Sequence, residues 1–156
     1  MNRVALALVA VALGAGWIAD ARAAEPDVFA ARCVICHQST ARGVPGIYPP
    51  LADSIGYDVL FKDGRDYLIH VVLGGLSGPI TVGGTTYNGL MPRFSQLTDA
   101  EIAAVLNEVL THFNAPELPK DFAPITPAEV RRARAMPLSA TELTRERSSL
   151  MNQQKR

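Results

Sequence analysis

The sequence predicts an all-α fold with one small hairpin, and two helical patterns and one glycine-rich segment carry this prediction. Apolar residues recur at helical spacing over 99–113, and a shorter helical pattern over 65–73 ends at a pair of glycines. Between these two patterns, β-branched and aromatic residues alternate around Gly83 and Gly84, which suit a tight hairpin turn. We therefore expect a helical framework with the hairpin inserted between two of its helices.

The segment before these helices has a helix and then a loop. Pro26 suits the first turn of a helix, which would carry Phe29 and Cys33 on one face. The segment 43–52, "GVPGIYPPLA", contains three prolines, which remove hydrogen-bond donors and fix backbone angles. It cannot be a regular helix or a central strand, so we expect a structured loop.

Residues 1–23 have the pattern of a secretory signal peptide. Arg3 precedes an apolar run over 4–18, and Ala21 and Ala23 occupy the two positions of an A-x-A cleavage site. This run of about 15 residues is shorter than the roughly 20 that span a bilayer, which disfavours an uncleaved anchor. We expect an exported, soluble periplasmic protein with no stable membrane insertion after cleavage.

The charge balance limits the partners that the chain can have. The 15 Lys and Arg residues match 15 Asp and Glu residues, so a broad cationic surface for nucleic acid is excluded. Acidic residues predominate before Pro116 and basic residues after it. This change, together with four prolines between 116 and 127, predicts one domain over 24–115 and a linker with a basic tail over 116–156.

The tail is expected to form two short helices. The capping-box pattern that precedes the helix over 99–113 recurs twice in the tail; its three instances are Thr98 with Glu101, Thr126 with Glu129, and Ser139 with Glu142. The tail helices carry too few apolar residues for an independent core, so they must pack on the domain or on another molecule. Their arginines make the tail a candidate docking arm, and a solvated basic face is the alternative.

Cys33, Cys36 and His37 form the motif C-x-x-C-H, which has four interpretations. A thioredoxin-like redox pair needs a βαβ context that is missing, and a zinc site lacks a fourth ligand. Chance pairing is the third interpretation, and covalent attachment of one c-type haem is the fourth. Two residues between the thiols let one turn of chain reach both vinyl groups of a haem, and His37 then lies where its Nε2 can bind iron.

A second axial ligand would decide between electron transfer and chemistry at an open iron. Met91 is the strongest candidate, because we expect a tight turn at Asn88 and Gly89 before it and Pro92 follows it. Four other residues are weaker candidates. Met136 and Met151 are expected to be packing residues of the tail, and His112 a solvated histidine. His70 is expected on a helix surface, with a haem-edge position or a partner contact as its alternatives.

Residues 24–115 resemble a class I monohaem cytochrome c of the bacterial periplasm. The resemblance rests on "CVICH", "GVPGIYPPLA", "GLSGPITVGGTTYNGLMP" and the final amphipathic helix. It implies that the carbonyl group of Pro45 accepts the Nδ1 proton of His37, that Leu51 packs on the haem, and that the first and last helices of the domain cross. The family's usual tryptophan at a haem propionate is missing after residue 23; the candidate substitutes are Tyr48, Tyr57, Tyr87 and Arg93.

The segment "GPITVGGTTYNGLMP" is similar to that of cytochromes serving periplasmic quinoprotein or sulfite-oxidising dehydrogenases. The resemblance implies a non-enzymatic electron carrier, or the cytochrome subunit of such an enzyme, which passes electrons to another cytochrome or a terminal oxidase. Two alternatives stay open: a haem enzyme or ligand sensor with an open distal site, and a cytochrome subunit that serves mainly as a structural tether in a respiratory complex.

Overall fold

The computed structural model describes residues 27–61 and 63–154. The predicted signal peptide over 1–23 and the predicted helix start at Pro26 lie outside the described residues. The elements are a π-helical turn Phe29–Cys33, α1 Val34–His37, α2 Gly64–Gly74, β1 Leu76–Val82, β2 Thr85–Met91, α3 Asp99–Phe113, α4 Pro127–Ala135 and α5 Ala140–Gln154, with 3-10 turns at Asp58–Leu60 and Ala115–Glu117. Within the described ranges, no helix is long and apolar enough to cross a membrane.

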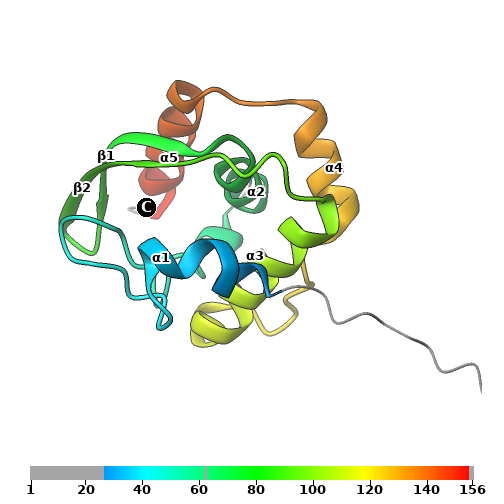
Figure 1. Ribbon diagram of the computed structural model, residues 1–156, viewed down its shortest axis with the longest axis horizontal. Coiled ribbons are helices and arrows are strands. Elements are labelled where there is room, and N and C mark those ends of the chain that lie inside the picture. Colours follow the sequence, from blue (N-terminus) through cyan, green and yellow to red (C-terminus); the bar gives the residue numbers. More distant parts are fainter. Residues whose placement is uncertain (1–26, 62, 155–156) are drawn as a thin grey trace, which may run out of the picture.

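The first helical segment crosses α3, as the resemblance implied (Figure 1). Phe29 is buried, and its ring centroid lies 5.2 Å from that of Phe113 at the end of α3. The segment passes from a π-helical turn into α1 without a break, a local widening that is frequent at functional sites. The crossing therefore fixes the π-helical turn, which ends at Cys33 of the C-x-x-C-H motif, against α3.

The predicted helix over 99–113 is α3 with the same bounds. Thr98 caps it through a hydrogen bond from the backbone N–H of Glu101, and the Glu101 carboxylate accepts from the Thr98 N–H at 2.7 Å. One face of α3 is buried, including the fully buried Ile102 and Leu110. The capping box and the apolar stripe thus set the length and the orientation of this helix, as the sequence indicated.

The hairpin forms at the predicted turn, but the second turn prediction is wrong. Gly83 and Gly84 have φ of 54° and 79°, the left-handed values that a two-residue hairpin turn requires. Asn88 and Gly89 do not turn, because the register set by this turn places them inside β2, opposite Pro79 and Gly78. Met91 is therefore delivered by the last position of β2, where it pairs with Leu76.

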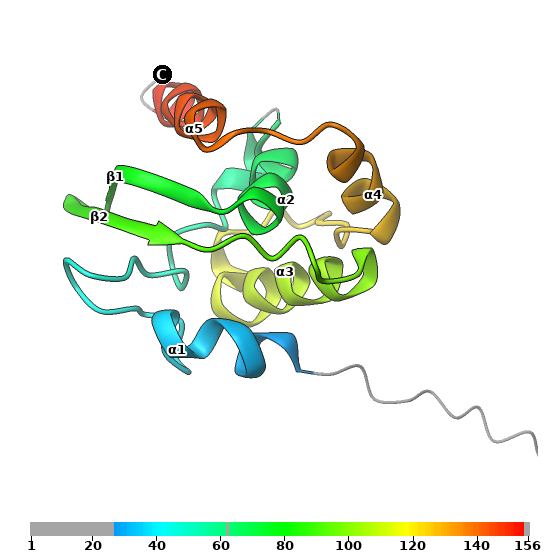
Figure 2. The same cartoon turned by 45° about the horizontal axis from the view of Figure 1, so that its top comes forward.

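The tail packs on the rest of the chain. α4 lies beside α2 and α3, and α5 lies along β1 and α2 (Figure 2). Val130 of α4 and Leu143 of α5 are fully buried in the same apolar cluster as α2 and α3. All three predicted capping boxes form, and α5 is longer than the short helix expected. The described residues thus share a single core.

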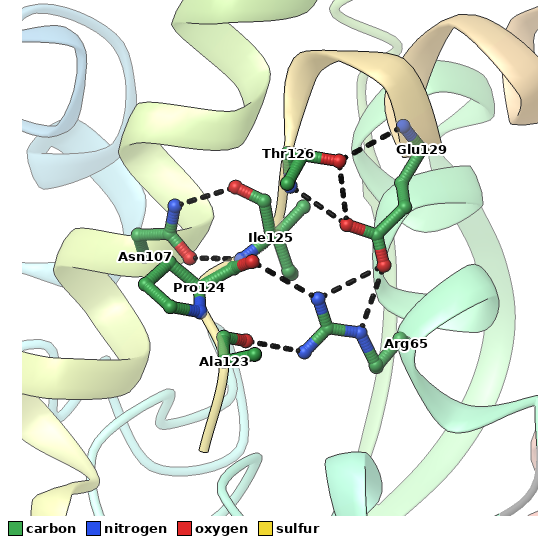
Figure 3. Close-up of polar contacts among 7 residues, drawn as sticks. All are labelled: Arg65, Asn107, Ala123, Pro124, Ile125, Thr126 and Glu129. Carbon is green, nitrogen blue, oxygen red and sulfur yellow. Dashed lines mark hydrogen bonds and ion pairs between the residues drawn. The ribbon is translucent and has the colours of Figure 1, made fainter. Parts of the chain in front are cut away.

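Two side chains of the core helices fasten the linker before α4 (Figure 3). Arg65 of α2 donates to the carbonyl oxygens of Ala123 and Pro124 and forms an ion pair with Glu129 at 2.9 Å. Asn107 of α3 pairs with both backbone groups of Ile125, which is buried. The linker is therefore held to two core helices, and it leads into α4, which packs against both.

Candidate haem site

A cavity of about 670 Å³ lies among the first helical segment, α2, the hairpin, α3 and α5. Its volume lies within the roughly 300–1,000 Å³ typical of cofactor sites. Cys33, Cys36 and His37 line it from the first helical segment, and Met91 lines it from β2. The remaining lining is largely apolar, so the cavity suits a large planar apolar group with thiol, imidazole and thioether donors around it.

Cys33 and Cys36 are half-buried free thiols, and they are the two cysteines of the chain. Burial, assisted by the negative charges of Glu108 and Asp27, raises the pKa of Cys33 to about 11. Among the described residues, no group of three or more His, Cys, Asp or Glu side chains gathers as a metal site would require. This geometry disfavours a zinc centre and leaves both thiols facing the cavity.

The His37 ring is buried and has a defined tautomer. Its Nδ1 lies 2.9 Å from the carbonyl oxygen of Pro49, and a carbonyl only accepts, so Nδ1 carries the proton and Nε2 has a free lone pair. Burial lowers the pKa of His37, which keeps the ring neutral, and the hydrogen bond to Pro49 opposes that shift. A neutral imidazole with its Nε2 lone pair free is the form that binds iron.

Pro49, not Pro45, supplies this carbonyl group, so the expectation for Pro45 is wrong. Val44 and Tyr48 exchange two backbone hydrogen bonds of 2.9 and 2.8 Å, which closes a small turn with Pro45 inside it. Pro45 therefore lies at the turn and does not line the cavity, whereas the chain returns to His37 at Pro49. Sequence spacing alone could not show which proline of this loop would present its carbonyl group to His37.

Gly43 makes this return possible. Its φ is +64°, and a Cβ atom on it would meet the carbonyl oxygens of Tyr48 and Pro49, the second at 2.6 Å. The backbone N–H of Gly43 also donates to the carbonyl oxygen of His37 at 2.9 Å. The loop thus lies directly against the end of α1, and only glycine leaves room for the Pro49 carbonyl group there.

Leu51 and Met91 both reach the cavity. Leu51 is fixed by a 2.7 Å hydrogen bond from its backbone N–H to the carbonyl oxygen of Ala41. Met91 is half-buried, and its backbone is packed tightly, because a Cβ on Gly75 would lie 2.5 Å from the Met91 carbonyl oxygen. A stiff support of this kind suits an iron ligand that must hold its position in both oxidation states.

The other candidate ligands are placed differently. Met136 is 65% exposed and is not in the cavity lining, whereas Met151 of α5 does line it. His112 is exposed, as expected. The expectation of a surface position for His70 is wrong: it is buried, with Nδ1 2.9 Å from the Asp66 carbonyl oxygen and Nε2 3.1 Å from that of Met136. His70 therefore joins α2 to the tail rather than to the cavity.

Three residues at the cavity wall were missed by sequence reasoning. Asp58 and Tyr67 are buried, and Arg147 reaches the cavity from α5. Burial raises the pKa of Asp58 to about 6 and also raises the pKa of Tyr67, while the nearby charge of Arg147 opposes both shifts. Of the four candidate propionate partners, Tyr48, Tyr57 and Tyr87 line the cavity, and Arg93 is absent from the lining.

The residues present thus fit a haem: two thiols and an imidazole on one helix, a thioether on the hairpin, and apolar walls between them. A cavity of this shape beside a C-x-x-C-H helix is the arrangement of c-type cytochromes, and the fold and the site together define that class.

The comparisons with known proteins agree with this class. The chain belongs to the cytochrome c family, whose model matches residues 26–111. It is similar to two proteins named cytochrome c-552 from Thermus thermophilus. One is 42% identical over 135 residues, which cover 86% of this chain and 90% of the relative; the other is 44% identical over 120 residues, with 77% and 92% covered. The chain is a monohaem c-type cytochrome, an electron-transfer protein that binds haem c covalently.

Proposed function

We propose that Cys33 and Cys36 form the thioether bonds to the haem and that His37 and Met91 are the axial ligands of its iron. The observation that carries this proposal is the hydrogen bond from His37 Nδ1 to Pro49, which leaves Nε2 as the free donor in a cavity that Met91 also lines. Leu51 packs on the haem in the same proposal.

When bound, the haem iron supplies one-electron chemistry. The chain orients the His37 ring through Pro49, which raises the basicity of the ligand. Met91 closes the second face, and a methionine ligand raises the reduction potential. The apolar walls exclude water, which also favours the less charged, reduced state of the site. Together these residues provide an electron carrier with no open coordination position.

We further propose that the protein is exported to the periplasm, accepts electrons from a periplasmic dehydrogenase and passes them to another cytochrome or a terminal oxidase. The signal-peptide pattern over 1–23 supports export. At the cavity, Ile35 and Leu90 are 83% and 75% exposed, and Ile47 is exposed beside them. Exposed apolar side chains around a cofactor site suit brief contact with a redox partner.

Replacing Met91 tests the axial ligation. We expect Met91→Ala to lose the weak near-infrared absorption that a thioether ligand gives ferric haem, and to bind carbon monoxide readily in the ferrous state. Met136→Ala is the matched control, because Met136 is exposed and outside the cavity lining, and it should keep both properties of the parent. Loss of the absorption in Met151→Ala with retention in Met91→Ala would instead assign the ligand to α5.

The proposed partner is tested by fractionation and co-purification. We expect the processed protein in the periplasmic fraction, together with a dehydrogenase that reduces it when given its substrate. Ready binding of carbon monoxide by the parent protein would favour a sensor or enzyme with an open site. A stable complex in which the haem stays oxidised during turnover would favour a structural tether.

A further inference from the structure

The tail contributes to the wall of the haem cavity. Arg147 and Met151 of α5 line it, although both lie well beyond residues 26–111, which the family model matches. α5 reaches this position because it packs along β1 and α2, with Leu143 and Leu150 buried beneath it (Figure 2). One wall of the cavity therefore comes from a segment outside the matched cytochrome domain.

Arg147 is held in place rather than left in solvent. Its Nη2 donates to the carbonyl oxygen of Thr81, near the tip of the hairpin, at 3.0 Å. Its charge acts on Asp58 and Tyr67, two residues that are 2% and 3% exposed and also line the cavity. The guanidinium group has five N–H donors, so donors remain after the bond to Thr81.

A haem brings two carboxylate groups into an otherwise apolar cavity, and a buried carboxylate needs a cation and hydrogen-bond donors. Among the described residues that line the cavity, the arginines are Arg32 and Arg147. Arg32 is exposed and stands next to Cys33, at the attachment end, whereas Arg147 is partly buried beside two buried polar groups. Only Arg147 therefore combines a fixed position with a charge inside the wall.

We propose that Arg147 is the positioning residue for a haem carboxylate, and that the tail helix thereby sets the orientation and the reduction potential of the haem. The proposal rests on the placement of the haem in this cavity. It replaces Arg93, the cation considered from the sequence, with a residue from another element. A planar guanidinium suits this role because it can bind a carboxylate through two parallel hydrogen bonds.

Asp58 gives the arrangement a pH dependence. Burial leaves Asp58 with a pKa of about 6, so near neutral pH its carboxylate shares the charge of Arg147 with the haem carboxylate. The other titratable groups that face this cluster are Tyr67 of α2 and Glu146, the neighbour of Arg147 on α5. Protonation of Asp58 removes one negative charge from the wall of the cavity, which disfavours the oxidised state of the haem, so the reduction potential should rise as the pH falls.

Redox titration of the holoprotein between pH 5 and pH 8 tests the proposal. We expect Arg147→Gln to lower the reduction potential, since a cation beside the haem is lost, and to change its pH dependence. Arg147→Lys should keep part of the potential but not the paired hydrogen bonds. In redox-difference infrared spectra of protein with isotopically labelled haem carboxylates, the carboxylate band should shift in both variants.

Arg145→Gln is the matched control, because Arg145 is an exposed arginine on the same helix. It should leave the potential and the infrared band unchanged. The proposal fails if Arg147→Gln and Arg147→Lys keep the parent's carboxylate band, or if Arg145→Gln shifts the potential as much. The near-infrared thioether absorption, measured on each variant, reports the Met91 ligand separately, so a failure of the axial assignment is distinguished from a failure of this proposal.

Discussion

At the scale of single residues, the orientation of the His37 ring depends on a glycine six positions later. Gly43 lets the carbonyl group of Pro49 lie where His37 Nδ1 can donate to it. Gln38, which directly follows His37, has φ of 64° and ψ of 161°, a region that residues other than glycine rarely occupy. Two residues that follow the proposed ligand thus have positive φ, which is strained at Gln38 and unstrained at Gly43 because glycine has no Cβ.

Gly43→Ala is expected to destabilise the protein by roughly 3 kcal/mol, because the left-handed backbone is strained by a Cβ and this Cβ also collides with two carbonyl oxygens. Gly46→Ala is the matched control: Gly46 has φ of +75° in the same loop, but a Cβ there meets nothing within 4 Å, so about 1 kcal/mol is expected. Urea unfolding measures both. Equal losses would show that backbone strain alone decides the effect.

Asp58 should make stability depend on pH. Burial raises its pKa from 3.8 to about 6, so the folded protein binds this proton more tightly than the unfolded chain does. The resulting penalty is absent below about pH 4, grows as the pH rises, and is complete above about pH 6. Asp58→Asn should therefore add up to about 3 kcal/mol to the free energy of unfolding at pH 7.5 and little at pH 3.5.

Urea unfolding at the two pH values, compared with the exposed control Asp121→Asn, checks this prediction. A gain of the same size at both pH values would mean that Asp58→Asn acts through packing rather than through the charge. A gain in Asp121→Asn would point to the net charge of the molecule instead.

At the scale of elements, short sequence motifs correctly predicted the helix starts and the hairpin turn, because neighbouring residues alone determine these features. The capping boxes at Thr98, Thr126 and Ser139 set helix starts, and the glycine pair at the hairpin set its turn. Asn88-Gly89 is an equally strong turn signal, but the turn predicted there is wrong. The strand register fixed by the first turn places both residues inside β2, where they are paired with β1. A local turn preference is overridden when the same backbone groups are already paired between two strands.

The attachment of the linker to the core should depend strongly on Arg65, although the Arg65 side chain is partly exposed. Arg65→Ala removes the contacts to Ala123, Pro124 and Glu129, and we expect a loss of about 2 kcal/mol. Arg42→Ala is the control, because the Arg42 side chain is 71% exposed in its ion pair with Asp53 and should contribute at most about 0.5 kcal/mol. Thermal unfolding followed by far-ultraviolet circular dichroism compares the two; similar shifts would contradict the anchoring role.

At the scale of the whole molecule, the linker and the tail join the apolar core of the matched cytochrome domain. Ile125, Val130 and Leu143 are buried in the same cluster as α2 and α3. Of the basic tail residues considered as a docking arm, Arg134 donates to Asp99 and to the carbonyl oxygens of Ser95 and Leu97, and Arg147 contacts the hairpin. These contacts favour unfolding of the whole chain in one cooperative step.

Leu143→Ala should therefore destabilise the haem domain as well as the tail, by about 3 kcal/mol, because it removes a fully buried side chain. The midpoint measured from helix dichroism and the midpoint measured from haem absorption should fall together. Met136→Ala, at an exposed tail position, should move neither midpoint by a measurable amount. A fall in the dichroism midpoint alone would show that the tail unfolds independently.

Contacts between distant segments are what the sequence could not reveal. The cysteines, His37 and Met91 stand out by motif and spacing, and the structure places all of them at one cavity. Asn114 does not stand out, yet its buried Oδ1 accepts from the backbone N–H groups of Ser54, Ile55 and Gly56, which shapes the loop beside the cavity. Arg147 could not be recognised from the sequence either, since it reaches the cavity only because α5 packs along β1 and α2.

The position of α5 also bears on how the protein matures. Proteins are synthesised from the amino terminus, so both cysteines are made long before the helix that carries Arg147 and Met151. Until that helix docks, the cavity lacks the part of its wall that Arg147 and Met151 supply. A chain that ends before α5 would therefore keep both cysteines, His37 and Met91 but would have an incomplete cavity wall.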